Sequence, residues 1–280
     1  MAEAEPESLS LTSDGTSVYW SNAYQVRRVS RCDGGVEIVA PKEDGWAIDL
    51  VHDDANVYWL ANEKAVRAVS LTGGAPRTLA TSPMPMPGGA LAIDAAYVYY
   101  ASVAGLARVP KSGGASEIVT AHMPKWAIAV DATRVYFGGD QVSGLMAVDK
   151  SGGTPLELVP RSGAAIGHIA VDDTYAYFTT TNFDPSNPRN DWVVGRVAKA
   201  GGPLLVLAQL EAPITALRID AKYVYWANED DRIRRVLTSG GGLDTIRTAK
   251  LGGDMIVTPD EILWTSFVDG GVYGIAKPKW

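Results

Sequence analysis

Four side chains that can carry charge or transfer a proton lie at equivalent points of a pattern that repeats along the chain. Each repeat contains a turn, and an aspartate marks it in six of the seven repeats. Asp49, His168 and Asp254 lie four residues before it, whereas Arg218 lies two residues before it. Most other repeats have small or aliphatic residues at these two positions. The four ionisable side chains therefore mark the place where chemistry is predicted.

Three kinds of chemistry fit these residue types. Arg218 and Asp254 can form an ion pair that only holds the structure together, because charged groups buried without partners are costly. His168 can act as a general base while Arg218 stabilises negative charge. Asp49, His168 and Asp254, with His122 as a further candidate, can also ligate a metal. No EF-hand or His-x-x-x-His spacing accompanies them, so no metal site is predicted.

The elements that must position these residues belong to a repeat of about 40 residues. A short stretch recurs as SVYW (17–20), NVYW (56–59), YVYY (97–100), RVYF (134–137), YAYF (175–178), YVYW (223–226) and EILW (261–264). Four short strand signals per unit, rich in aromatic and β-branched residues, are typical of a β-propeller blade. The sequence therefore predicts an all-β, single-domain, seven-bladed β-propeller with four-stranded blades over residues 1–280. The blades are expected at approximately residues 8–40, 46–80, 89–120, 126–160, 166–209, 214–248 and 253–280.

The stretch YVYW is apolar on both sides because each blade packs between two others. We predict that Val224 and Trp226 face one neighbouring blade while Tyr223 and Tyr225 face the other. An aspartate recurs before each such stretch, at Asp14, Asp53, Asp94, Asp131, Asp172 and Asp220, and is expected to cap its turn. Glycine pairs at 34–35, 73–74, 113–114, 152–153, 201–202 and 240–241 are expected to supply positive φ for the third turn.

The last blade is predicted to be incomplete. Few residues precede the first inner strand, so the N-terminus offers almost nothing to complete the ring. Residues 272–280 supply a third strand, and Pro278 disfavours a fourth. We therefore expect a three-stranded seventh blade, held mainly by face-to-face packing.

With YVYWANEDDRIRRV at 223–236 followed by a glycine cluster, the repeat resembles those of YWTD, NHL and TolB-like propellers. The resemblance covers nearly the whole chain at the level of the repeat, and it implies a propeller fold. YWTD repeats carry Thr-Asp after Tyr-Trp and usually form six blades. Here Ser21-Asn22 or Ala227-Asn228 follow, and seven units are present. The resemblance therefore implies no receptor function.

Function is expected at only one end of the propeller. The aspartate and glycine turns are alike in most units, whereas the loops at the other end differ in length and chemistry. The longest of these is 179–192, and the loops at 42–46, 82–89 and 121–126 add apolar and aromatic residues. The predicted ligand-binding residues at the channel mouth are Trp46, Asp49, Trp126, His168, Trp192, Arg218 and Asp254.

Two functions are open for this mouth. The first is a binding or interaction module that recognises a small polar ligand, or a peptide or protein partner. The second is a small propeller enzyme, a lyase or hydrolase with or without a metal, with His168, Arg218 and Asp254 as catalytic candidates. No nucleophile elbow, phosphate loop or dinucleotide fingerprint decides between them, and the sequence identifies no cofactor.

Composition limits the partners. The net charge is −7 without basic clusters, which argues against nucleic acid. No apolar run approaches the ~20 residues that span a bilayer, so a soluble protein without membrane insertion is expected. The first residues show no signal peptide, which fits either an exported protein whose signal has been removed or a cytoplasmic protein. Cys32 is the only cysteine, so cysteine usage leaves the compartment open.

Overall fold

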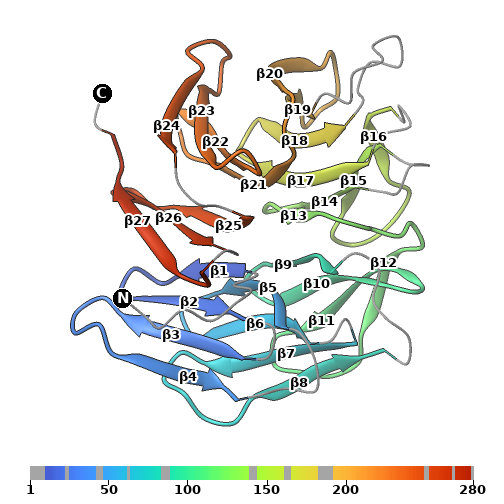
Figure 1. Cartoon of the computed structure of the whole chain (residues 1–280). Helices are drawn as coiled ribbons and strands as arrows, with labels where there is room; N and C mark the ends of the chain where they lie inside the picture. Colours follow the sequence, from blue (N-terminus) through green and yellow to red (C-terminus); the bar gives the residue numbers. More distant parts are fainter. Residues whose placement is uncertain are drawn as a thin grey trace.

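The computed structural model describes residues 10–22, 25–41, 47–61, 64–82, 89–138, 144–160, 165–181, 192–248, 252–266 and 269–278. In this part of the chain, seven antiparallel sheets stand in a ring around a central axis, and every assigned element is a β-strand (Figure 1). The predicted seven-bladed, all-β propeller is confirmed. The described residues include no helix long and apolar enough to cross a membrane.

Each sheet is one blade, and its strands follow one another from the axis outward. Blade 1 is β1 (Ser10–Ser13), β2 (Ser17–Ser21), β3 (Val26–Ser30) and β4 (Val36–Ala40). Blade 2 is β5 (Ala47–His52), β6 (Asn56–Ala61), β7 (Ala65–Ser70) and β8 (Arg77–Thr81). Blade 3 is β9 (Leu91–Ile93), β10 (Tyr97–Ser102), β11 (Gly105–Pro110) and β12 (Glu117–Thr120). Blade 4 is β13 (Ile128–Val130), β14 (Arg134–Gly138), β15 (Leu145–Asp149) and β16 (Leu156–Val159).

The remaining three blades complete the ring. Blade 5 is β17 (Ile166–Val171), β18 (Tyr175–Thr181), β19 (Trp192–Ala198) and β20 (Leu205–Leu210). Blade 6 is β21 (Ile214–Ile219), β22 (Tyr223–Asn228), β23 (Arg232–Leu237) and β24 (Asp244–Thr248). Blade 7 is β25 (Gly252–Val257), β26 (Glu261–Ser266) and β27 (Val272–Ala276).

The second strand of each blade is deeply buried because neighbouring blades cover both of its faces. Val224 and Trp226 pack with Leu207 of blade 5, whereas Tyr225 packs with Ile262 of blade 7. The alternation predicted from YVYW is therefore confirmed. Large aromatic side chains bury about 150–250 Å² each, so this alternation supplies much of the apolar contact between blades.

The turn aspartate of blade 3 contacts its own turn, the second strand of its blade and the next blade. In blade 3, Asp94 Oδ1 accepts hydrogen bonds from the backbone N–H groups of Ala96 and Tyr97, both at 2.8 Å. Its Oδ2 accepts the hydroxyl of Tyr99 at 2.8 Å and forms an ion pair with Lys150 of blade 4 at 2.8 Å. One carboxylate thus caps the turn, orients a buried tyrosine of the second strand and binds the next blade.

The same arrangement recurs around the ring. The aspartate–tyrosine bond is present in six blades, as Asp14–Tyr19, Asp53–Tyr58, Asp94–Tyr99, Asp131–Tyr136, Asp172–Tyr177 and Asp220–Tyr225. A lysine of the next blade joins four of them, as Lys111–Asp53, Lys150–Asp94, Lys199–Asp131 and Lys277–Asp220. The backbone caps were predicted, but the tyrosine and lysine partners were not. The lysines could have been recognised from the sequence, because each of them directly follows the third strand of its blade.

In the part of the chain that the structure describes, the last blade has three strands, in the order β25-β26-β27, so the predicted incomplete blade is confirmed. The ring closes where blade 1 packs against blade 7, with Leu11 and Trp20 against Leu263. Arg31, just after β3, adds an ion pair with Glu261 at 2.6 Å. Face-to-face contacts therefore close the ring at this seam.

Candidate functional site

In four blades, the side chain four residues before the turn forms a hydrogen bond with the inner strand of the following blade. Ser10 Oγ of blade 1 accepts the backbone N–H of Leu50 of blade 2 at 2.9 Å. Asp49 Oδ2 of blade 2 accepts the N–H of Leu91 of blade 3 in the same way. The three unlike side chains predicted at this position, Asp49, His168 and Asp254, each reach the inner strand of the following blade. Holding adjacent blades together is therefore their first role.

Asp254 carries this contact across the closing seam of the ring. Its Oδ2 accepts the N–H of Leu11 and the hydroxyl of Ser10, both at 3.2 Å. Its Oδ1 accepts Arg218 Nη2 at 2.6 Å and the N–H of Met255 at 2.7 Å. The ion pair between Arg218 and Asp254 thus joins blade 6 to blade 7, while the other carboxylate oxygen joins blade 7 to blade 1.

His168 forms hydrogen bonds with both nitrogens of its ring. Nε2 lies 3.0 Å from the carbonyl oxygen of Thr215, which can only accept, so Nε2 carries the proton. Nδ1 lies 3.0 Å from the hydroxyl of Thr179, which in turn accepts the N–H of His168 at 3.0 Å. Loss of hydration, with the nearby Arg218 cation, lowers the pKa of His168 to about 4. The ring is therefore a neutral bridge between blades 5 and 6.

The pH behaviour of His168 gives a direct check. We expect NMR to show this imidazole neutral, with its proton on Nε2, from pH 8 down to about pH 5. The unfolded chain takes up the same proton near pH 6.5. The stability contributed by neutral His168 is therefore complete above that pH and is lost as the pH falls toward 4. A folded-state titration midpoint above pH 6, with the chain in urea as the reference, would contradict this assignment.

Asp49 has a left-handed backbone conformation and a carboxyl group with a raised pKa. Its φ is +52°, the left-handed region, where a short polar side chain is better tolerated than most. The inner strand has an irregularity between Ile48 and Val51, and this turns the Asp49 side chain toward Leu91. Loss of hydration raises the pKa of Asp49 to about 7, and the nearby Asp254 adds to the effect. The Asp49 carboxyl therefore binds a proton at a much higher pH than an ordinary aspartate does.

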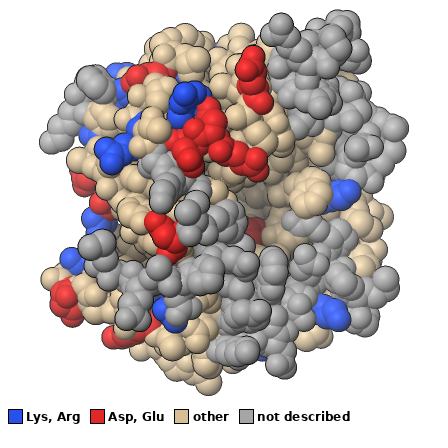
Figure 2. Space-filling view, in the orientation of Figure 1, with Lys and Arg blue, Asp and Glu red and all other residues tan. Residues whose placement is uncertain are grey.

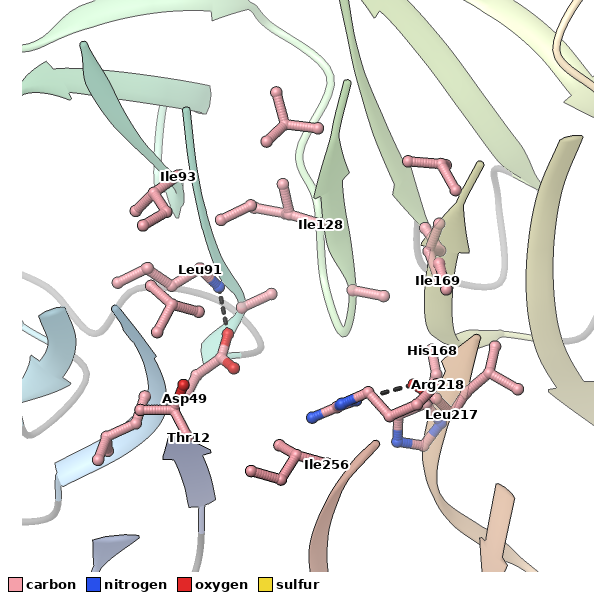
Figure 3. A pocket seen from close by; sticks show the side chains of 18 of the residues that line it. Thr12, Asp49, Leu91, Ile93, Ile128, His168, Ile169, Leu217, Arg218 and Ile256 are labelled. Carbon is pink, nitrogen blue, oxygen red and sulfur yellow. Dashed lines mark hydrogen bonds between the residues drawn. The ribbon is translucent and has the colours of Figure 1, made fainter. Parts of the chain in front are cut away.

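Two adjoining spaces lie along the axis of the ring. The outer one, of about 440 Å³, is lined by Ser10, Asp254 and the glycines at the start of β25, among others. The inner one, of about 490 Å³, continues along the inner strands. Both spaces are lined by the same four polar or aromatic side chains, namely Asp49, Trp126, His168 and Arg218. These four define the channel collar. Figure 3 shows Arg218 reaching into the space from one side and Asp49 lying on the other.

Beyond the channel collar the wall of the channel is mainly aliphatic. Half-buried side chains from six blades face it, among them Ile93, Ile169 and Ile256 (Figure 3). The polar exception is a pair formed by Thr12 Oγ1 and His52 Nδ1 at 2.6 Å. The channel therefore changes from polar at the channel collar to apolar beneath it.

The three predicted rim tryptophans differ in position. Trp126 lines both spaces with half of its side chain exposed, and Lys125 Nζ lies 5.4 Å from the centre of its ring. Trp192 begins β19 and packs against the apolar core between blades 5 and 6, so the structure does not bring it to the channel. Trp46 lies outside the described residues, as do most of the loops at 42–46, 82–89 and 179–192.

The metal alternative gains no ligand cluster in the described part of the chain. No three histidine, cysteine, aspartate or glutamate residues described here are grouped so that they could hold an ion. His122 does not line either axial space, and its Nδ1 lies 3.1 Å from the hydroxyl of Thr120.

Sequence reasoning missed two threonines that orient the inner-strand residues. The hydroxyl of Thr179 accepts the backbone N–H of His168 at 3.0 Å, and in blade 7 the hydroxyl of Thr265 accepts the backbone N–H of Asp254 at 2.9 Å. Both are completely buried on the second strand. Each follows an aromatic residue of its repeat directly, in Phe178-Thr179 and Trp264-Thr265, and this position could have identified them.

Comparisons with known proteins identify the fold but no close relative. No family model matches the chain, and no curated protein matches it. The WD40 propeller domain of Doa1 is similar in structure, with a TM-score of 0.78, 13% identity, and coverage of 100% of this chain and 95% of that one. A catalytically inactive variant of virginiamycin B lyase from Staphylococcus aureus, solved with quinupristin, has a TM-score of 0.74 and 14% identity, covering 98% and 96%. BamB from Moraxella catarrhalis has a TM-score of 0.62 and 13% identity, covering 95% and 83%.

These identities are low enough that the similarities concern the fold alone. Binding domains and enzymes both occur among the similar propellers, so the fold does not choose between the two functions. The repeat-level resemblance predicted from the sequence is confirmed. This chain is a seven-bladed β-propeller with a three-stranded closing blade.

Proposed function

We propose that the chain binds a small polar or zwitterionic ligand, or the end of a peptide, non-covalently at the channel collar. One observation carries the proposal: a guanidinium and a carboxyl from distant blades line the same two axial spaces beside an exposed tryptophan. Concave sites with apolar walls and a few convergent polar groups are the usual places for small ligands.

The hydrogen bonds of Arg218 support this role. The described residues use one bond from Nη1, to the carbonyl of Leu217 at 2.8 Å, and one from Nη2, to Asp254 at 2.6 Å. A guanidinium has five N–H donors, so three are left for a ligand or for water. Asp49 engages Oδ2 with the N–H of Leu91, and its second oxygen is available as an acceptor or, when protonated, as a donor.

Charge balance narrows the ligand class. Arg218 is paired with Asp254, and the raised pKa of Asp49 reduces its negative charge, so the channel collar has little net charge of its own. A ligand with both an acidic and a basic group can satisfy both sides of the site. In the space-filling view, acidic side chains gather above a hollow near the middle of the ring, while basic ones are scattered (Figure 2). A surface of this kind does not favour a polyanion.

Replacing Arg218 tests the proposal. Arg218→Gln is expected to weaken binding at least tenfold, because a charge-assisted bond to the ligand is worth about 1.5–3 kcal/mol. The probes are free L-amino acids and dipeptides, and the readout is the NMR shift of the Trp126 indole N–H, assigned with Trp126→Phe. Arg77→Gln, on the exposed outer strand β8, is the control. Equal affinities in the wild type and Arg218→Gln would exclude the channel collar as the site.

Catalysis at the channel collar has less support than non-covalent binding. A lyase or hydrolase mechanism would use His168 as the general base, but both of its nitrogens are occupied and its pKa is lowered to about 4. A general base works best when its pKa is near the working pH and its lone pair faces the substrate. We therefore favour binding without reaction, and mass spectrometry of each bound probe after prolonged incubation should return it unchanged.

A further inference from the structure

Four neighbouring blades place an aliphatic, β-branched residue at the same level of the channel wall. This level is the last residue before the turn aspartate, and it holds Ile93, Val130, Val171 and Ile219 in blades 3 to 6. Each of the four lines the inner axial space and is half-buried, so part of its side chain faces the space itself. These four side chains define the aliphatic arc, an apolar surface along one side of the channel.

The other side of the same level is polar but carries no charge at pH 7. His52 of blade 2 lies there, with its Nδ1 2.6 Å from Thr12 Oγ1 of blade 1. Loss of hydration lowers the pKa of His52, which keeps the imidazole neutral at pH 7. Among the described residues that line the inner space, Asp49 and Arg218 are the ones that can be charged at this pH, and both belong to the channel collar. A charged group of a ligand therefore finds its partners at the channel collar and not beneath it.

Short side chains leave room between the channel collar and the aliphatic arc. They come from blades 3, 4 and 5 and line the inner space, namely Ala90, Ala92, Ala127, Gly167 and Ala170. The level of His168 lies three residues before that of Val171 on β17, which is about 10 Å along the strand. The inner space is therefore a passage with a polar entrance and an apolar interior.

Neither a purely polar nor a purely apolar ligand matches both parts of this passage. A small polar ligand at the channel collar leaves the aliphatic arc facing water, and covering apolar surface is favourable in proportion to its area. A hydrocarbon would cover the arc, but it would take Arg218 and Asp49 out of water without a partner. Figure 3 shows Arg218 reaching into the same space that Ile93 and Ile169 border. A molecule with a polar head and an aliphatic chain satisfies both parts.

We propose that the ligand of the channel collar is an amino acid with a straight aliphatic side chain, and that this chain extends along the inner space against the aliphatic arc. This ligand class depends on the proposed function, because Arg218 receives the carboxylate and the second oxygen of Asp49 receives the amino group. A straight chain passes Arg218 more easily than one branched next to the head, because the guanidinium reaches into the space. A six-carbon chain is about 8 Å long when extended, so it fits within the apolar interior.

A series of amino acids that differ only in chain length tests the proposal. L-alanine, L-norleucine and L-2-aminooctanoate are titrated at pH 7, and the NMR shift of the Trp126 indole N–H reports binding. A fully buried methylene strengthens binding about fourfold, and half of that free energy corresponds to about twofold. The five additional carbons of 2-aminooctanoate should therefore strengthen binding about thirtyfold or more relative to alanine, with norleucine between them. Equal affinities of alanine and 2-aminooctanoate would overturn the proposal.

Isoleucine methyl groups report where the chain lies. With carbon-13 in these groups, 2-aminooctanoate should shift the δ1 methyl signal of Ile93, assigned with Ile93→Val, whereas alanine should not. A nuclear Overhauser effect should join this methyl group to the terminal methyl of the ligand. Ile38, exposed on the outer strand β4, is the control and should not shift. A chain-length effect on affinity without a shift at Ile93 would place the chain outside the channel and overturn the proposal.

Polar replacement of the aliphatic arc gives a matched pair of variants. Val130→Thr combined with Val171→Thr keeps the β-branched shape but adds two hydroxyls to the wall. The ratio of the 2-aminooctanoate affinity to the alanine affinity should fall about fivefold or more, because covering a hydroxyl with an apolar chain is costly. Val36→Thr combined with Val103→Thr, at two exposed valines away from the axial spaces, should leave the ratio unchanged. Circular dichroism in urea checks that both variants are folded, and an unchanged ratio in the folded arc variant would overturn the proposal.

Heptylamine separates this proposal from the proposed function. It is 2-aminooctanoate without the carboxylate, so it should bind about tenfold or more weakly than the amino acid. Arg218→Gln should weaken alanine and 2-aminooctanoate by similar factors. If it does so but chain length has no effect, the aliphatic chain is excluded and the proposed function stands. Heptylamine that binds as tightly as 2-aminooctanoate, with the same affinity in Arg218→Gln, would exclude the channel collar and overturn both proposals.

Discussion

Asp254→Ala is expected to lower the free energy of unfolding by about 3 kcal/mol. The variant leaves Arg218 without its carboxylate and the N–H of Leu11 without its acceptor, at the seam where the ring closes. The expected value is at the low end for a buried pair, because Arg218 exposes 35% of its side chain, although Asp254 exposes only 15%. This contact lies at the seam between the three-stranded blade 7 and blade 1, so its loss should lower the stability of the whole ring.

Urea denaturation at pH 7 measures this effect through the transition midpoint at constant m value. Asp254→Asn should fall between the wild type and the alanine variant, because the amide oxygen can still accept one hydrogen bond but carries no charge. Asp173→Ala, at an exposed turn residue, is the matched control and should change stability by less than about 0.5 kcal/mol. A loss in Asp254→Ala no larger than in this control would contradict the role assigned to the carboxylate.

Asp94→Ala is expected to cost about 2–3 kcal/mol at pH 7. It removes the acceptor of two backbone N–H groups and the partner of the Tyr99 hydroxyl, and Tyr99 is completely buried. It also leaves Lys150 of blade 4 without its carboxylate. Asp54→Ala, at an exposed neighbouring position in the equivalent turn of blade 2, should change little. Equal unfolding midpoints for the two variants would contradict the arrangement.

The lowered pKa values of the turn aspartates predict that acid destabilises the fold. Desolvation raises the pKa of Asp94, but hydrogen bonds from Lys150, the turn backbone and Tyr99 outweigh it and lower the pKa to about 2. Equivalent contacts lower the pKa of Asp53 to about 2. An ordinary aspartate titrates near 4 in the unfolded chain, so this stability is complete above pH 4 and is lost as the pH falls toward 2. The difference in melting temperature between wild type and Asp94→Ala should therefore shrink between pH 5 and pH 2.5; a difference that grows would contradict it.

The sequence by itself determined the architecture, because the repeat is encoded locally. Each YVYW-like stretch alternates apolar side chains with a period of two, and this pattern is stable only when both faces of the strand are covered. The turn residues act within a few positions of themselves, as when Gly113 and Gly114 take up φ angles of +85° and +130°. The number of blades and the incomplete last one follow from counting such units.

The tertiary structure decided what the four ionisable residues do. Their partners are far away in the sequence: Asp254 meets Leu11, and His168 meets Thr215. Such contacts depend on how each blade is rotated and placed against the next. The alignment of repeats indicated that these side chains meet near one mouth, but not that Asp49, His168 and Asp254 each bond to the following inner strand.

Charge states also required the three-dimensional arrangement, because a pKa depends on hydration and on nearby charges. Asp49 and Asp94 are both aspartates near an inner strand, yet the pKa is about 7 for the first and about 2 for the second. Asp49 is stripped of water beside Asp254, whereas Asp94 receives hydrogen bonds from a lysine, a tyrosine and two backbone groups. The two share a residue type and lie close to the inner strands of the same repeat pattern, but only the packing between blades shows how far apart their pKa values are.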